Sequence, residues 1–314
     1  MQYTKLGRTG VDVSQIILGA WQFGKQAWGE IKDDESVQTM FAAIDAGINM
    51  IDTAVGYGSG YSEEIVARTV REAPQDCLIA SKVMGPPDGI RQGIDAALAR
   101  MEVDCIDLYQ LHYPQPRCPI ADQVGAMKEI QDAGKIRWIG VSNFDLAQMQ
   151  EAIATARIET CQPPYNVFWR QFEDDVLPLC GEHEIAVIPY SPLAQGLLAG
   201  RFRKLEDVPA DIRANNKLMT PETLERCVPV IDRLEAIGQA HGKTLVQAAI
   251  AWTIQAPNIT APIIGARRAA QLDENLGGVG WGLTDEEWNE VSEAGKAISA
   301  DLDFSSNMWG WAPK

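Results

Sequence analysis

Short apolar runs alternate along the whole chain with longer segments in which apolar residues follow a helical period. Eight runs have the length of a strand and end in polar residues or glycine. They cover residues 16–19, 50–53, 78–82, 108–112, 138–143, 159–162, 186–191 and 262–265. Strands that alternate with helices are typical of a parallel sheet covered by helices, so an α/β fold is expected.

The segments between the runs carry the boundary signals of helices. The first repeats apolar residues from Val37 to Ile44, after the acidic start Asp33-Asp34-Glu35 and before Gly47. Further helices are expected near residues 62–70, 88–101, 119–133, 145–156, 173–182, 221–240, 244–256 and 284–297. At the start of the chain, residues 3–6 and 11–13 flank the turn 7–10 and predict a β-hairpin.

The spacing of the strand ends favours a closed barrel. Four polar residues end successive runs at intervals of 30 positions, about one strand–helix–strand unit each: Asp52, Lys82, His112 and Ser142. Eight such units close naturally into a (β/α)8 TIM barrel with an N-terminal β-hairpin, as one domain over residues 1–314. The alternative, a doubly wound sheet, lacks its glycine-rich first turn. Residues 191–220 form a long excursion after the seventh run, a length typical of lids.

Charge and composition narrow the classes of function. The 314 residues are 46% hydrophobic with a net charge of −16, which disfavours nucleic acid and anionic membranes as partners. The apolar runs are too short for a membrane helix and the start has no signal-peptide pattern, so a cytoplasmic location is expected. The six cysteines lack metal-ligand spacing, so reduced thiols and no metal site are expected. The oligomeric state leaves no signal in the sequence.

Three motifs resemble those of other enzymes but lack essential residues. Residues 19–25 follow most of a P-loop pattern, yet Gln26 stands where Ser or Thr should bind magnesium. His183-Glu184 is not followed by the second histidine of a zinc hydrolase. The acidic run 173–175 indicates a solvated helix start rather than a glycosidase pair.

Four residues suit proton delivery to a carbonyl oxygen. The C-terminal ends of barrel strands meet at one site, which would hold Asp52, Tyr57, Lys82 and His112. A Lys82 ammonium beside the Tyr57 phenol would lower the phenol's pKa by about 1–3 units. Asp52 would keep the ammonium charged, and His112 would donate a hydrogen bond to the substrate oxygen. Each residue alone also has an ordinary structural explanation, but the set of four fits hydride transfer better than hydrolysis.

A series of motifs follows in a fixed order along the chain. They are Asp52-Thr53-Ala54-x-x-Tyr57-Gly58 with Ser62-Glu63, the strand ends Lys82 and His112, Gly140-Val141-Ser142-Asn143-Phe144, Gln162-x-x-Tyr165-Asn166, Pro189-Tyr190-Ser191-Pro192-Leu193, and Ile264-Gly265-Ala266-Arg267-Arg268 with Glu274-Asn275. In this order and spacing they resemble the aldo-keto reductase superfamily, in particular its bacterial branch, over essentially the whole chain. The resemblance implies reduction of aldehydes or ketones, with the tetrad Asp52, Tyr57, Lys82 and His112 and with Tyr57 as the general acid.

The resemblance also implies a nicotinamide cofactor. The positions that match its carboxamide-binding residues are Ser142, Asn143 and Gln162, and Tyr190 matches the residue stacked on the ring. The loop over the pyrophosphate would contribute Ser191, Leu193 and Gln195. The adenosine-phosphate end would contribute Gly265, Ala266, Arg267, Arg268, Gln271, Glu274 and Asn275. A helix that begins near two arginines suits a phosphate dianion, so NADP(H) is expected over NAD(H).

Two positions depart from the pattern of the superfamily. Pro163-Pro164 stiffens the loop after Gln162, and Gly265-Ala266 replaces the Lys-Ser pair of the mammalian-type branch. The two prolines are therefore expected to shift the carboxamide contact, and the geometry around the 2′-phosphate cannot be carried over from the mammalian-type branch.

The sequence allows more than one interpretation of the substrate pocket and of the function. Five aromatic residues indicate either an apolar wall for the substrate or packing of the tail onto the barrel: Trp21, Phe23, Trp28, Trp309 and Trp311. A regulatory or interaction subunit that holds the cofactor, like the channel-associated members of the superfamily, is the main rival to a reductase. A barrel hydrolase would need a second carboxylate beside Asp52 at the strand ends.

Overall fold

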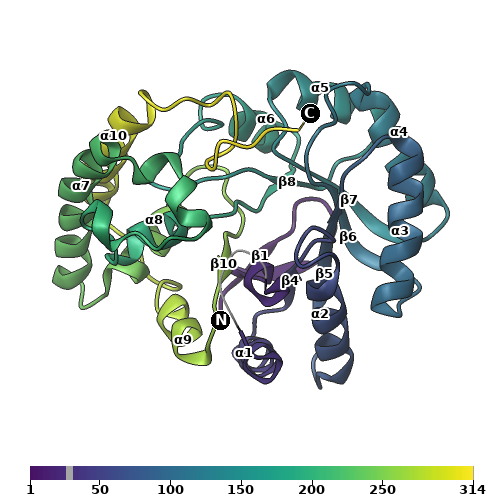
Figure 1. The fold of residues 1–314 in the computed structure, drawn as a ribbon, viewed down its shortest axis with the longest axis horizontal. Coiled ribbons are helices and arrows are strands. Elements are labelled where there is room, and N and C mark those ends of the chain that lie inside the picture. The colour runs from purple at the N-terminus through teal and green to yellow at the C-terminus, as the bar shows by residue number, and fades with distance from the viewer. Residues whose placement is uncertain (26–30, 314) are drawn as a thin grey trace.

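The computed structural model describes residues 1–25 and 31–313 and confirms the (β/α)8 barrel (Figure 1). One sheet of parallel strands runs in the order β10-β3-β4-β5-β6-β7-β8-β9. The strands are β3 (Ile17–Gly19), β4 (Met50–Asp52), β5 (Leu78–Val83), β6 (Ile106–Leu111), β7 (Ile136–Ser142), β8 (Thr160–Gln162), β9 (Ala186–Val187) and β10 (Ile263–Gly265). Parallel bridges from Val187 to Ile259 and from Tyr190 to Ile263 join the two edges and close the sheet.

Strand β9 is shorter than the sequence pattern predicts. It ends at Val187, whereas the apolar run continues to residue 191. Pro189 has no backbone N–H to continue the hydrogen-bond ladder, so regular pairing stops there. Pairing resumes in single bridges at Tyr190, which keeps this residue at the barrel rim.

Helices surround the strands and lie close to the predicted segments (Figure 1). They are α1 (Asp33–Asp45), α2 (Tyr61–Glu72), α3 (Pro87–Met101), α4 (Ile120–Asp132), α5 (Leu146–Thr155), α6 (Val176–Glu182), α7 (Pro221–Ala240), α8 (Leu245–Gln255), α9 (Ala269–Leu276) and α10 (Asp285–Ser299). Local sequence fixes several of their ends. Helices α5, α8 and α10 each begin with a capping box, in which the side chain of Asp145, Thr244 or Thr284 accepts from the backbone N–H of the third helical residue.

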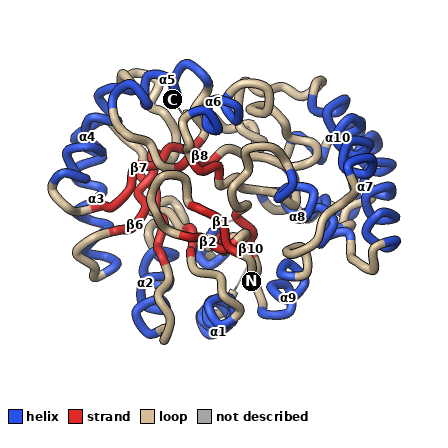
Figure 2. Tube along the Cα trace, turned by 180° about the vertical axis from the view of Figure 1, so that it is seen from behind, coloured by secondary structure: helices blue, strands red, loops and turns tan. Residues whose placement is uncertain are grey.

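The N-terminal hairpin covers one end of the barrel. Strands β1 (Tyr3–Lys5) and β2 (Asp12–Ser14) pair antiparallel, which confirms the predicted hairpin. Figure 2 shows them near the middle of the view, beside β10. Leu6 and Val13 are buried there against apolar barrel residues such as Met50 and Leu108. The hairpin closes this end, so the opposite end, where the parallel strands finish, is left for a ligand.

The long excursion and the C-terminal tail lie over the open end. Residues 191–220 fold into the short 3-10 helices η2 (Ala194–Ala199), η3 (Leu205–Asp207), η4 (Ile212–Asn215) and η5 (Lys217–Met219), and we call this segment the lid. The tail after α10 runs back across the barrel and ends near α5 (Figure 1). A backbone hydrogen bond of 2.8 Å from the Lys217 N–H to the Met308 carbonyl joins lid and tail. Within the described residues, none of the helices has the length and apolarity needed to cross a membrane.

Candidate active site

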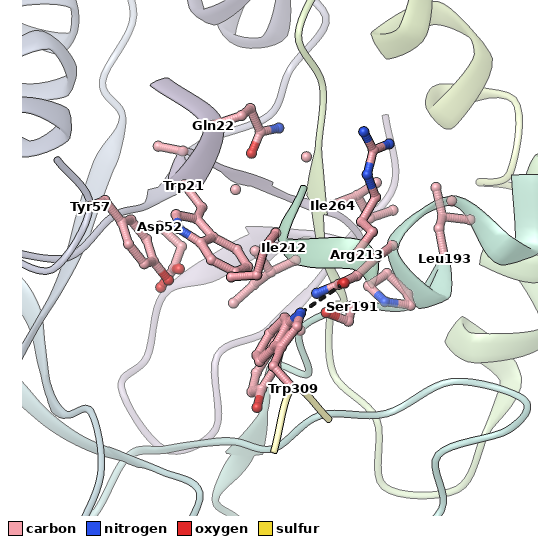
Figure 3. A pocket seen from close by; sticks show the side chains of 18 of the residues that line it. Trp21, Gln22, Asp52, Tyr57, Ser191, Leu193, Ile212, Arg213, Ile264 and Trp309 are labelled. Atoms are coloured by element: carbon pink, nitrogen blue, oxygen red, sulfur yellow. Dashed lines mark hydrogen bonds between the residues drawn. The ribbon is translucent and has the colours of Figure 1, made fainter. Parts of the chain in front are cut away.

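A cavity of about 670 Å³ lies at the C-terminal ends of the strands, between the barrel, the lid and the tail. This is the end at which TIM barrels carry their active sites. Figure 3 shows Tyr57, Asp52 and Trp21 on one side of the cavity, with Leu193 and Arg213 on the other. A cavity of this size, lined by apolar side chains and a few polar groups, suits a small organic ligand.

Lys82 joins Asp52 and Tyr57 at the base of the cavity. Its Nζ lies 2.5 Å from Asp52 Oδ1 and 3.3 Å from the Tyr57 hydroxyl. A third hydrogen bond of 2.8 Å leads to the Thr53 carbonyl oxygen. Lys82 is fully buried and does not line the cavity, whereas Asp52 and Tyr57 do. The ammonium therefore acts from behind the phenol, and the phenol faces the ligand space.

The loop after β4 fixes the position of Tyr57. A turn hydrogen bond runs from the Tyr57 N–H to the Ala54 carbonyl, and the Tyr57 carbonyl accepts from Ser62 at the start of α2. On its other side the loop touches the 3-10 helix η1 (Trp21–Gly24). A Cβ on Gly24 would lie 2.6 Å from the Tyr57 carbonyl carbon, so the two backbones meet at a distance that only glycine permits.

The expected lowering of the Tyr57 pKa is wrong. Burial raises the pKa of Tyr57 well above its ordinary value of 10, and the negative charge of Asp52 adds to this. Burial also lowers the pKa of Lys82, against the opposing effect of the Asp52 carboxylate. Desolvation thus outweighs the nearby ammonium, and Tyr57 keeps its proton at neutral pH.

His112 faces Tyr57 from the end of β6. Their rings meet edge to face with centroids 6.0 Å apart. Burial lowers the pKa of His112 well below 6.5, and the Lys82 ammonium lowers it further. The imidazole is therefore neutral at pH 7 and can donate one hydrogen bond to an oxygen atom in the cavity.

Polar side chains inside the barrel hold the second oxygen of Asp52. Asp52 Oδ2 accepts from Gln162 Nε2 at 2.9 Å and from Gln110 Nε2 at 3.3 Å. Gln162 lines the cavity as the resemblance implies, but its amide nitrogen is bonded to Asp52. Gln110 could not be recognised from the sequence, because a polar residue two positions before a strand end gives no signal of its own.

Asn143, Ser142 and Tyr190 form one hydrogen-bonded group. The Tyr190 hydroxyl donates to Asn143 Oδ1 at 2.8 Å, and Asn143 Nδ2 donates to the His112 carbonyl at 2.9 Å. Ser142 is fully buried outside the cavity lining, and its hydroxyl donates to the Gln162 carbonyl. Asn143 and Tyr190 line the cavity directly. Asn143 has a left-handed backbone (φ 62°), which turns its side chain at the strand end.

The lid and the segment around α9 supply the far end of the cavity. Most of the residues assigned to these parts line it: Ser191, Leu193, Gln195, Gly265, Arg267, Gln271, Glu274 and Asn275. Ala266 is buried and Arg268 is exposed, and neither belongs to the lining. The structure thus places Arg267 at the cavity, whereas Arg268 occupies the position before the first residue of α9.

The aromatic residues divide into wall and core. Trp21, Trp309 and Trp311 line the cavity, and the rings of Trp21 and Trp309 meet edge to face at 5.2 Å. Phe23 is wrong as a wall residue, because its side chain is fully buried in the core. Trp28 lies outside the described residues.

Several polar lining residues escaped the sequence analysis. They are Gln22, Tyr113, Arg201, Arg213, Asn215 and Asn307. Tyr113 directly follows His112, so its place after a strand end was the available signal. Arg201 and Arg213 lie in the lid, where neither periodicity nor spacing shows which residues turn inward. The available signal for these two residues was their positive charge within a strongly acidic chain.

Comparisons with known proteins agree with this architecture. A family model described as the aldo/keto reductase family matches residues 15–296. A solved structure of glycerol dehydrogenase from Gluconobacter oxydans is similar, with a TM-score of 0.85 and 33% identity over 94% of this chain and 96% of the other.

Relatives extend the similarity over nearly the full length. Aldo-keto reductase YhdN of Bacillus subtilis is 34% identical over 93% of both chains. An NADH-specific methylglyoxal reductase of Escherichia coli is 29% identical over 95% of this chain and 99% of that protein. A probable voltage-gated potassium channel subunit beta of Arabidopsis thaliana is 34% identical over 88% of this chain and 90% of the other. The chain therefore belongs to the aldo/keto reductase family.

Proposed function

We propose that the protein reduces aldehydes or ketones with NADPH and that Tyr57 donates the proton. The observation that carries this proposal is the contact of Lys82 Nζ with both Asp52 and the Tyr57 hydroxyl, at 2.5 and 3.3 Å. A buried ammonium that is paired with a carboxylate and touches a cavity-facing phenol suits proton transfer to a ligand oxygen. Within the described residues, no cluster of side chains could hold a metal ion.

The cavity fits a nicotinamide dinucleotide. At one end it offers the Tyr190 ring with the Asn143 and Gln162 amides beside the proposed acid, and at the other the Arg267 guanidinium. Between them the lid turns tightly through Ser191 and Gln195, both of which have left-handed backbones. Tight turns of this kind point backbone N–H groups toward bound anions. These residues would hold the ring, the pyrophosphate and the adenosine phosphate in that order.

The preference for NADPH over NADH rests on the arginines at the adenosine end. Arg267 lines the cavity, and Arg268 precedes the free backbone N–H groups at the start of α9. Because one relative is an NADH-specific reductase, titration with both cofactors is the test of this preference.

In this proposal each catalytic residue has one task. When bound, the reduced nicotinamide supplies the hydride. His112, neutral and facing Tyr57, donates a hydrogen bond that orients the carbonyl oxygen. Tyr57 transfers its hydroxyl proton to that oxygen, and Lys82 stabilises the negative charge left on the phenol. Asp52 holds the ammonium in place through its 2.5 Å contact.

The test is a consumption assay at 340 nm with NADPH and NADH in parallel, over a panel of aldehydes, ketones and sugars. The expected result is oxidation of NADPH that depends on a carbonyl compound. Absence of turnover with every compound and both cofactors would contradict the proposal.

A second candidate is a regulatory subunit that binds the cofactor with little turnover. The similarity to a probable potassium channel subunit of Arabidopsis thaliana favours it. Tight NADPH binding without carbonyl-dependent oxidation would point to this function.

A further inference from the structure

Beside the proposed catalytic residues, the cavity holds a second pair of hydrogen-bonding side chains. Tyr113 directly follows His112, and the two rings lie 5.2 Å apart. Asn307 comes from the tail, and its Nδ2 donates to the Tyr113 hydroxyl at 3.1 Å. Both residues line the cavity. The Tyr113 ring therefore lies beside the imidazole that would orient the carbonyl oxygen.

The tail backbone fixes the orientation of the Asn307 amide. Its Oδ1 accepts from the N–H groups of Trp309 and Trp311, each at 3.0 Å. With the oxygen committed to the tail, the amide nitrogen must face Tyr113 and the cavity. The amide thus presents donors to the cavity, and it does so without freedom to flip.

A hydrogen bond also holds the Tyr113 hydroxyl at the cavity wall. The Tyr113 oxygen accepts from Asn307 Nδ2, which leaves its second lone pair for another donor. The phenol oxygen and the Asn307 amide are consequently set to bind a further hydroxyl group from the cavity side.

The remaining walls around this pair are aromatic and close together. Trp311 meets Tyr113 edge to face at 4.7 Å, and Trp309 meets Trp21 in the same way. Trp309 Nε1 also donates to Gln195 Oε1 of the lid at 2.9 Å, which ties the tail across the cavity. Such rings can pack against the C–H groups of a substrate, and the tied tail bounds the cavity on this side.

We infer that the substrate is a short carbonyl compound with a hydroxyl group close to the carbonyl, and that Tyr113 and Asn307 bind this hydroxyl. The inference rests on the proposed function, because His112 and Tyr57 set the place of the carbonyl oxygen. A wall for simple aldehydes needs no polar pair, whereas polar groups in a ligand-filled cavity lose free energy unless the ligand bonds them. A site built to bond a hydroxyl discriminates strongly against analogues that lack it.

The test compares three matched ketones: hydroxyacetone, methoxyacetone and butanone. Methoxyacetone keeps the electron-withdrawing oxygen of hydroxyacetone and lacks its hydroxyl proton, and butanone replaces the hydroxyl with a methyl group. For the wild-type protein, kcat/KM should be at least about tenfold higher for hydroxyacetone than for either analogue, the value of one or two neutral hydrogen bonds. In Tyr113→Phe this ratio should fall to within about threefold.

Two further variants distinguish loss of hydroxyl binding from a non-specific effect of substitution on the protein. Tyr3→Phe removes an exposed phenol whose hydroxyl bonds the Gly47 carbonyl, far from the cavity, and should leave the ratio unchanged. Asn307→Asp keeps the oxygen that binds the tail backbone, removes the amide donor, and should lower the ratio as Tyr113→Phe does.

The outcomes distinguish this inference from the proposed function. Equal kcat/KM values for the three ketones in the wild type, or a ratio that Tyr113→Phe leaves intact, would overturn the hydroxyl site while the reductase stands. No oxidation of either reduced nicotinamide with these ketones or with simple aldehydes would overturn the proposed function and this inference with it.

Discussion

The two ends of the cavity are built in different ways. At the catalytic end, Asp52 and Lys82 belong to neighbouring strands, and the sheet ladder sets the distance between their backbones. At the proposed adenosine end, Arg213 comes from the lid, where it pairs with Asp211, and Arg267 comes from the segment before α9, so no sheet ladder sets the distance between them. If the proposed function holds, the scaffold would fix the catalytic residues, whereas the loops would decide which cofactor and substrate bind.

The largest effect should come from the proposed acid. Tyr57→Phe removes the proton donor but keeps the ring, so kcat should fall by about 10²- to 10⁴-fold. NADPH binding, measured by fluorescence quenching, should stay near the wild-type value. A matched control is Tyr109→Phe, since the Tyr109 hydroxyl is buried without a hydrogen-bond partner among the described residues. Turnover of Tyr57→Phe within tenfold of the wild type would remove Tyr57 from its role.

The next largest effect concerns stability at the same end. Lys82→Met leaves the Asp52 carboxylate buried without its cation, and the free energy of unfolding should fall by about 3–5 kcal/mol. Adding Asp52→Asn should recover much of this loss, because no buried charge then remains. Lys128→Met is the control, since Lys128 pairs with Asp132 on an exposed helix face and should cost under about 1 kcal/mol. Urea unfolding that shows equal losses for Lys82→Met and Lys128→Met would contradict this account.

The adenosine end should respond in binding rather than in turnover. Arg267→Ala should raise the Kd for NADPH roughly 10- to 100-fold, the worth of a charged hydrogen bond, and the Kd for NADH much less. Arg268→Ala should have the smaller effect, because Arg268 is exposed and Arg267 lines the cavity. Titration of both cofactors against both variants decides the point. Equal weakening of NADPH and NADH binding would remove the phosphate-binding role.

The smallest effect is a pH dependence of stability. Because burial holds the folded-state pKa of His112 below 6.5, the unfolded chain takes up a proton below pH 6.5 that the folded protein does not. The contribution to stability is present above pH 6.5 and is lost as the pH falls, by at most about 1.4 kcal/mol per unit. His112→Gln should therefore lose less unfolding free energy than the wild type between pH 7.5 and 5.5. Identical losses in the two proteins would show that His112 is not the group concerned.

The sequence predicts the regular part of the molecule well for a physical reason. Apolar runs and caps encode strands and helices locally, and a 30-residue repeat places Asp52, Lys82 and His112 at neighbouring strand ends. Phe23 was wrongly assigned to the cavity wall, because the sequence of a turn after a strand does not reveal which aromatic ring points into the core.

Sequence patterns predict neither the effect of burial on the Tyr57 pKa nor which lid residues face the cavity. The charges near Tyr57 were visible in the sequence, but the desolvation that outweighs them depends on the packed structure. Arg213 reaches the cavity through a lid of irregular 3-10 turns, where no period marks the inner face. The strand that begins at Ala186 is shorter than predicted, because the apolar run continues past Pro189, where the missing backbone N–H ends regular pairing.

The close contact between Gly24 and Gly58 links the placement of the acid to the loop after the first barrel strand. A Cβ on Gly58 would lie 2.3 Å from the Gly24 carbonyl oxygen, so neither position accepts a side chain without moving the other. Tyr57 immediately precedes Gly58, and any shift of that backbone carries the phenol away from Lys82. Grafting the loop after the first barrel strand from another enzyme would therefore succeed only if the new loop kept a glycine at position 24, opposite Gly58.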